Sequence, residues 1–193
     1  MSELILALIS AALINNLVLH QALAIDPLLQ APVESDRRRV HALGLATLVL
    51  LVLTTSLGQL LYRYALQPLQ LDYLRLFVFL PLCVLLIEPL LGWLSRLLPA
   101  LPLRDLRPLL LGNVALLGLT LQVSQDGYGV LQTLAWGLGG GLGFWLALGL
   151  FDDLRQRSEH DAIPLAFRGL PIELIGAGVM ALAFLGFNGL FTS

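Results

Sequence analysis

Residues 108–123 read PLLLGNVALLGLTLQV, an apolar stretch of 16 residues that Gly112 and Asn113 interrupt near its start. At ~1.5 Å per helical residue the stretch reaches only about 24 Å, less than the roughly 30 Å of a bilayer's hydrocarbon core. An amide side chain in hydrocarbon must find hydrogen-bond partners, and a break in a helix frees backbone groups that can serve. The stretch therefore predicts a membrane segment broken at Gly112 and Asn113.

Five further apolar stretches accompany this one in the chain of 193 residues. Hydrophobic residues make up 58% of the sequence, charged residues only 12%, and the mean hydropathy is +0.85. These values exclude an ordinary soluble domain and are typical of an integral membrane protein. A span needs about 20 apolar residues. The predicted spans are residues 3–24, 40–61, 74–94, 108–123, 129–151 and 170–191.

The first and fourth spans share a feature that predicts internal symmetry. The first carries Asn15 and Asn16 in its middle, and the fourth carries Asn113. These spans lie three apart, and an odd number of crossings reverses direction, so the second half is predicted to be inverted relative to the first. We expect a single all-α transmembrane domain of six helices in two inverted three-helix repeats, with the first and fourth spans broken or present as half-helices. The domain covers 1–193, and the repeats cover about 1–97 and 104–193.

The positive charges are sorted by side. Most of the eleven basic residues fall in the first, third and fifth connections between spans. Arginine and lysine accumulate in cytoplasmic loops, so both termini of this multi-pass chain are expected on the opposite, periplasmic side. The basic residues of the first, third and fifth connections are Arg37, Arg38, Arg39, Arg96, Arg104, Arg107, Arg155, Arg157 and Arg168. The opposite side carries only Arg63 and Arg75.

Asn15, Asn16 and Asn113 are the best intrinsic candidates for a functional site. One interpretation is that they brace half-helices around a central site, because an amide can bond the backbone groups freed at a break. The other is that they only hydrogen-bond across helices, at about 1 kcal/mol each. The sequence leaves both open.

Glu88 and His20 are candidates for an ion or proton path. Glu88 lies in the third span, and a carboxylate at a helix centre costs roughly 2.5–3.5 kcal/mol on insertion scales. It either has an ion-related role or is protonated or paired with an arginine near the cytoplasmic interface. His20 precedes Asp26 at the end of the first span, so the two either relay protons or mark the approach to water.

Other chemistry is limited. No span contains a nucleophile with a matched base, and no basic arm indicates nucleic acid. The single cysteine, Cys83, cannot form an intramolecular disulfide or an all-protein metal site, so it is expected to pack in the core. The pairs Gly137/Gly141 and Gly139/Gly143 predict close packing within the bundle or against a partner subunit, with a glycine-lined functional break as the alternative.

Several runs resemble a family of membrane subunits, those of the Rnf and Nqr ion-translocating complexes. The run NNLVL at 15–19, followed by Asp26-Pro27, is similar to the first span of the RnfA subunits of the Rnf complex. The runs IPLAFRG at 163–169 and GVMALAFLGFNGL at 178–190 are similar as well. The E-type subunit of the sodium-translocating NADH:quinone oxidoreductase is the near alternative, but its first span is expected to lack the paired asparagine.

The resemblance implies a bacterial inner-membrane subunit, itself non-catalytic, of a multi-subunit oxidoreductase. Such a complex couples electron transfer between ferredoxin and NAD to ion transport. The implied partners are a homologous, inverted membrane subunit (RnfE type) and the other subunits of the Rnf complex, beside the lipid bilayer, with no nucleic acid. The alternatives are a small inverted-repeat secondary transporter with a site between the asparagines, and a purely structural scaffold subunit.

The sequence departs from the family at two positions. The family carries one cysteine where this chain has Asp26 and another where it has Val114, and with two partner cysteines these would hold a [2Fe–2S] cluster. Such clusters are held by thiolates, and valine offers no ligand. Cys83 lies in another span and replaces neither. We therefore expect no cofactor to be held by this chain.

Overall fold

The computed structural model describes residues 2–23, 27, 29, 37–158 and 163–186. Within these residues all regular structure is helical, as the composition predicts. The α-helices are α1 (Ser2–Ile9), α3 (Arg37–Leu61), α4 (Arg75–Leu97), α5 (Arg107–Leu111), α6 (Val114–Gln125), α7 (Val130–Ser158) and α8 (Leu170–Leu185). Shorter helical turns are η1 (Ser10–Ile14), η2 (Tyr62–Leu66), η3 (Asp72–Leu74), η4 (Arg104–Leu106) and η5 (Leu165–Phe167).

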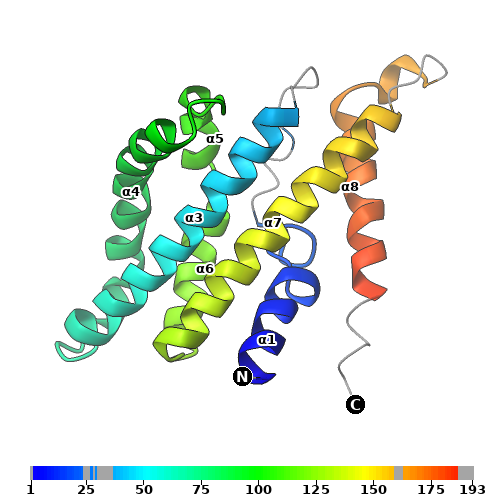
Figure 1. The fold of residues 1–193 in the computed structure, drawn as a ribbon. Coiled ribbons are helices and arrows are strands. Elements are labelled where there is room, and N and C mark those ends of the chain that lie inside the picture. Colours follow the sequence, from blue (N-terminus) through cyan, green and yellow to red (C-terminus); the bar gives the residue numbers. More distant parts are fainter. Residues whose placement is uncertain (1, 24–26, 28, 30–36, 159–162, 187–193) are drawn as a thin grey trace.

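Four of the helical segments are long and apolar enough to cross a membrane. They are Arg37–Leu66, Asp72–Leu97, Arg107–Gln125 and Val130–Ser158, and they coincide with the predicted second to fifth spans. Two shorter apolar helices, Leu4–Ile14 and Leu170–Leu185, lie within the predicted first and sixth spans. The segments run alternately up and down, so that α1 begins, and α8 ends, toward the same side of the bundle (Figure 1).

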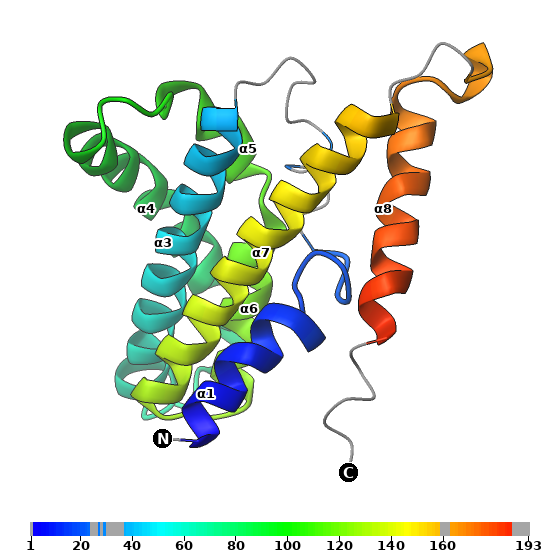
Figure 2. The same ribbon diagram turned by 45° about the vertical axis from the view of Figure 1, so that its right-hand side comes forward.

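The centre of the bundle is the crossing of α3 and α7, which run antiparallel and share the most extensive contact in the structure (Figures 1 and 2). Glycine makes this contact possible. A Cβ atom at Gly141 would lie 2.7 Å from Cα of Leu48, and one at Gly137 would lie 3.1 Å from Cα of Val52. The backbones therefore approach as closely as small residues allow, which is how helices gain packing energy in lipid.

The other glycine pair of α7 faces the beginning of the chain. A Cβ atom would lie 2.6 Å from the carbonyl oxygen of Leu8 if placed at Gly139, and 2.6 Å from that of Ala12 if placed at Gly143. Helix α7 thus packs closely against α3 through Gly137 and Gly141, and against α1 and η1 through Gly139 and Gly143. The interpretation of both pairs as packing positions is confirmed.

The outer helices bury much less of their surface than α3 and α7. Met180 is the only residue of α8 that is buried, and α4 exposes Phe77, Leu85 and Trp93. Exposed apolar side chains of this density are suited to lipid or to another membrane helix. The polar ends are also distinct. The arginine-rich segments (the starts of α3, α5 and α8 and the ends of α4 and α7) all lie at the upper end in Figures 1 and 2.

Replacing Gly141 by alanine is expected to destabilise the crossing, because the new methyl group would meet the backbone of Leu48. Forced overpacking of this kind costs about 1–3 kcal/mol. Thermal unfolding in detergent should show a clear fall in Tm for Gly141→Ala. The matched control is Gly92→Ala on α4, where a Cβ atom has nothing within 4 Å. Equal Tm values for the two variants would contradict the packing role.

Candidate functional site

Asn16 lies where the first helical segment ends. The π-helical turn η1 closes with a hydrogen bond of 2.7 Å from the Asn15 amide to the Ser10 carbonyl, and residues 15–23 are not helical. Asn16 has no exposed surface. Its Oδ1 accepts from the backbone N–H groups of Val18 (3.0 Å) and Leu19 (3.2 Å). The side chain thus caps the backbone that the break frees.

The amide nitrogen of Asn16 ties the break to its neighbours. Nδ2 donates to the carbonyl of Ala12 at 2.8 Å and to the carbonyl of Gly143 in α7 at 3.0 Å. Asn15 does much less, since its Nδ2 donates only to the Ser10 hydroxyl, at 3.2 Å. Of the doubled asparagine, Asn16 is therefore the residue that holds the break in place.

Asn113 occupies the matching position in the fourth segment. Helix α5 ends at Leu111, Asn113 is extended (φ −81°, ψ 90°), and α6 begins at Val114. The Asn113 side chain is only 4% exposed. Its Oδ1 accepts from the Ala115 amide at 3.1 Å, which is an N-cap of α6, and its Nδ2 donates to the Thr47 hydroxyl of α3 at 3.4 Å. The break predicted at Gly112 and Asn113 is confirmed.

The two buried asparagines have reciprocal roles. Asn16, in the first segment, bonds to α7, while Asn113, in the fourth, bonds to α3. Since α3 and α7 cross at the centre, the two breaks are anchored to opposite members of one helix pair. Among the described residues this is the polar seam of the bundle, and its amide groups are already engaged by this chain.

Glu88 pairs with Arg107. The Glu88 carboxylate on α4 lies 2.6 Å from Nε of Arg107 at the start of α5, and the two side chains are 59% and 61% exposed. The geometry agrees with the arginine-paired interpretation of Glu88. His20 is exposed and lies in the turn that follows Asn16 in the sequence. In the part of the chain described, no hydrogen bond or ion pair joins His20 to Glu88. Their role in an ion or proton path stays a prediction.

The positions at which the family resemblance implies cluster ligands are described only in part. Asp26 lies outside the described residues. Val114 is the first residue of α6, next to the break, and is 52% exposed. Cys83 is buried in α4. No group of three or more histidine, cysteine, aspartate or glutamate side chains suited to a metal ion occurs within residues 2–23, 37–158 and 163–186.

The sequence predicts close packing at Gly143, but it does not predict which residues the two asparagines contact. The Thr47 hydroxyl accepts a hydrogen bond from Asn113, and the Gly143 carbonyl accepts one from Asn16. Gln21 donates to Gln122 at 3.2 Å, which joins the segment after the first break to α6. Arg155 and Glu173 form an ion pair of 2.7 Å between α7 and α8, only 10% and 9% exposed. The hydrophobic pattern of the sequence shows whether each of these residues lies within a span or near its end. Which residue it pairs with depends on the tertiary structure.

The fold and the polar seam define a multi-pass α-helical membrane protein with interrupted helices. A family model described as "Rnf-Nqr subunit, membrane protein" matches residues 4–191, and the chain belongs to this family.

Three relatives illustrate how far the similarity extends. The chain is 40% identical to the A-type subunit of the ion-translocating oxidoreductase complex of Syntrophotalea carbinolica and 39% identical to the protein of that name in Pseudomonas aeruginosa, over 98% of each chain. It is 35% identical, over 97% of each chain, to the A-type subunit of the Na(+)-translocating ferredoxin:NAD(+) oxidoreductase complex of Acetobacterium woodii.

Replacing Asn16 by alanine is expected to cost much more stability than replacing Asn15. Asn16→Ala leaves buried backbone groups without partners at the break, which predicts a loss of about 2–4 kcal/mol, against less than about 1 kcal/mol for Asn15→Ala. Equilibrium unfolding in mixed micelles measures both. Similar losses for the two variants would show that Asn16 does not hold the break.

Proposed function

We propose that the chain is a membrane subunit, itself non-catalytic, of a redox-driven ion-translocating oxidoreductase complex of the Rnf type. The observation that carries this proposal is identity of 35–40% along nearly the whole length of relatives named as the A-type subunits of such complexes. In one relative the printed name specifies ferredoxin, NAD(+) and Na(+). For this chain we propose the same reaction class, electron transfer between ferredoxin and NAD coupled to ion transport.

We further propose that the chain crosses the membrane six times as two inverted repeats. The reciprocal contacts support this, because a two-fold relation that exchanges the first with the fourth span also exchanges the second with the fifth. Under it the bond from Asn16 to Gly143 corresponds to the bond from Asn113 to Thr47. The alternating directions of the helices in Figure 1 are those that the repeat requires.

The proposed location is the bacterial inner membrane, with both termini on the periplasmic side. Its support is the arginine-rich upper end, which the positive-inside rule assigns to the cytoplasm. The start of α1 and the end of α8 point to the opposite end (Figures 1 and 2).

The proposed partners are a homologous inverted subunit (RnfE type) and the other subunits of the complex. Exposed groups around the fourth segment favour a protein contact on this face. Leu111 and Val114 flank the break with 46% and 52% of their surface exposed. The Glu88–Arg107 ion pair beside them is also more than half exposed, and a charged pair is better satisfied against protein than against hydrocarbon.

We propose that this chain supplies no ligand to an iron–sulfur cluster. Val114, at one of the two implied positions, has an aliphatic side chain with no donor atom. The other position holds an aspartate, and iron–sulfur clusters are held by thiolates. The residues present do not fit the group, so no electron-transfer step is assigned to it. The side chains of Asn16 and Asn113 are bonded within the chain itself, which favours the scaffold interpretation over a carrier whose substrate site lies between the asparagines.

Deletion of the gene for this chain, with complementation, tests the function. Loss of the chain is expected to abolish both NAD reduction by ferredoxin and ion uptake into inverted vesicles, because the complex cannot assemble. The purified chain alone in liposomes should transport nothing, and the EPR spectrum of the complex should be unchanged by Asp26→Ala. Solute uptake by the isolated chain would favour the transporter instead.

A charge swap separates the two roles considered for Glu88. If the pair is structural, Glu88→Gln and Arg107→Gln each weaken the complex by up to about 1 kcal/mol, and the double variant Glu88→Arg/Arg107→Glu recovers most of that stability. Ion uptake by vesicles should follow stability in all three variants. Restored stability with ion uptake still absent would instead place Glu88 on the ion path.

A further inference from the structure

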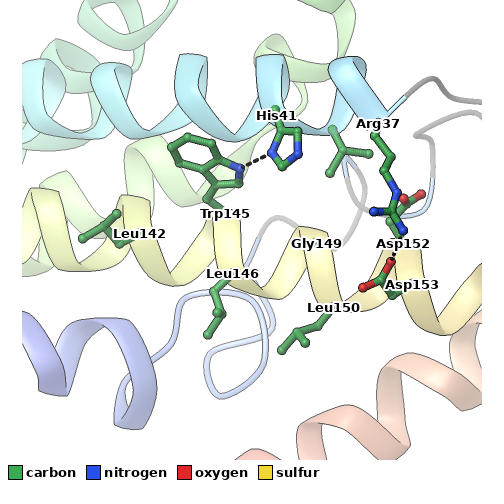
Figure 3. A pocket seen from close by; sticks show the side chains of 10 residues that line it. Arg37, His41, Leu142, Trp145, Leu146, Gly149, Leu150, Asp152 and Asp153 are labelled. Atoms are coloured by element: carbon green, nitrogen blue, oxygen red, sulfur yellow. Dashed lines mark hydrogen bonds and ion pairs between the residues drawn. The ribbon is translucent and has the colours of Figure 1, made fainter.

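A groove of about 430 Å³ opens between α3 and α7 near the arginine-rich end (Figure 3). Its apolar part is a row on successive turns of α7, formed by Leu142, Leu146 and Leu150, each 42–43% exposed. A Cβ atom at Gly149, which also lines the groove, has nothing within 4 Å. Among the described residues, none fills the wall at this point.

The upper end of the groove is polar and carries both signs of charge. Arg37 lies 3.3 Å from Asp153, and the two side chains are 71% and 53% exposed. Asp152 also lines the groove, but it is buried and accepts a hydrogen bond from Gln156 at 2.9 Å, so the exposed charges of the rim are those of Arg37 and Asp153. Figure 3 shows Arg37 reaching across from α3 to Asp153 on α7. The rim thus offers one cation and one anion, both accessible.

His41 adds a donor to this rim. The Trp145 indole nitrogen, which can only donate, is 3.2 Å from Nδ1 of His41. Nδ1 must therefore accept, and in the neutral imidazole the proton is then on Nε2. The His41 side chain is exposed, so Nε2 can donate to an anionic group outside the protein.

The groove spans two layers of the membrane. At 1.5 Å per residue, Leu142 and Asp153 are separated by about 16 Å along α7, which is about half of a hydrocarbon core. With the arginine-rich end at the cytoplasmic face, as proposed above, the leucine row lies in the hydrocarbon and the rim at headgroup level. A ligand that matches both layers has an acyl chain and a polar head with one positive and one negative group.

We propose that this groove binds a zwitterionic phospholipid of the phosphatidylethanolamine type from the leaflet at the arginine-rich end. The phosphate accepts from Arg37 and from Nε2 of His41, the ammonium group contacts Asp153, and one acyl chain lies along the leucine row. An anionic head without the ammonium group would leave Asp153 facing negative charge. The proposal rests on how the chain lies in the membrane, not on electron transfer, so activity and lipid retention are separate readouts.

Native mass spectrometry of the intact complex tests the groove. The complex is taken from nanodiscs of equal phosphatidylethanolamine and phosphatidylglycerol. Gly149→Leu, whose Cβ atom would meet nothing within 4 Å, should fill the groove and lower retention of phosphatidylethanolamine about tenfold, the loss expected when roughly 1.4 kcal/mol of binding energy is removed. The control is Gly92→Leu, at a position equally open on α4, and it should retain lipid as the wild type does.

A second pair of variants tests the headgroup contacts. Arg37→Gln with Asp153→Asn should lower retention roughly threefold to tenfold and remove the preference over phosphatidylglycerol, because two exposed charge contacts are lost. The control is Arg39→Gln with Asp105→Asn, a surface pair at 3.2 Å outside the groove, which should change neither quantity.

Three results would overturn the proposal. The first is retention unchanged by Gly149→Leu. The second is a preference for phosphatidylglycerol that the Asp153→Asn variant does not alter. The third is a crosslink from position 149 to a helix of another subunit, which would show that protein, not lipid, occupies the groove.

Discussion

The structure depends on the need to satisfy, without water, the backbone groups that two broken helices release. In hydrocarbon an unpaired N–H or carbonyl costs several kcal/mol, so a break survives only where nearby groups satisfy the freed backbone. Asparagine is a short side chain that supplies both donors and an acceptor. Asn16 uses its oxygen for Val18 and Leu19 and its nitrogen for Ala12 and Gly143.

That solution requires a close neighbour, which explains the glycine beside it. A Cβ atom at Gly143 would lie 2.6 Å from the Ala12 carbonyl and 2.9 Å from Nδ2 of Asn16. The asparagine can reach the Gly143 carbonyl only because nothing stands between α7 and η1. Sequence features that look separate, a doubled asparagine and a glycine pair, are thus two sides of one contact.

The sequence predicts features that depend on neighbouring residues, such as a helix break, better than it predicts contacts between residues far apart in the chain. The break at Asn113 could be predicted, because the stretch is too short for a straight span and an amide in hydrocarbon implies freed backbone nearby. Its partner Thr47 could not, since a single threonine in an apolar helix has no local signal that distinguishes it from Thr54, whose hydroxyl bonds within its own helix to Leu51. The sequence offers two roles for Glu88, and the identity of its partner, Arg107, follows only from the fold.

The position of Val114 shows that the requirements of the fold and those of a metal ligand are separable in this chain. The cap of α6 is made by Asn113, and the Val114 side chain points outward with half of its surface exposed. The hydrogen bonds of the break do not involve the side chain of residue 114, so valine can occupy the position while they stay unchanged. The asparagines are different, because each is buried and bonded to the helix pair that forms the core. The polar seam is therefore constrained by folding even where residue 114 has no ligand to offer.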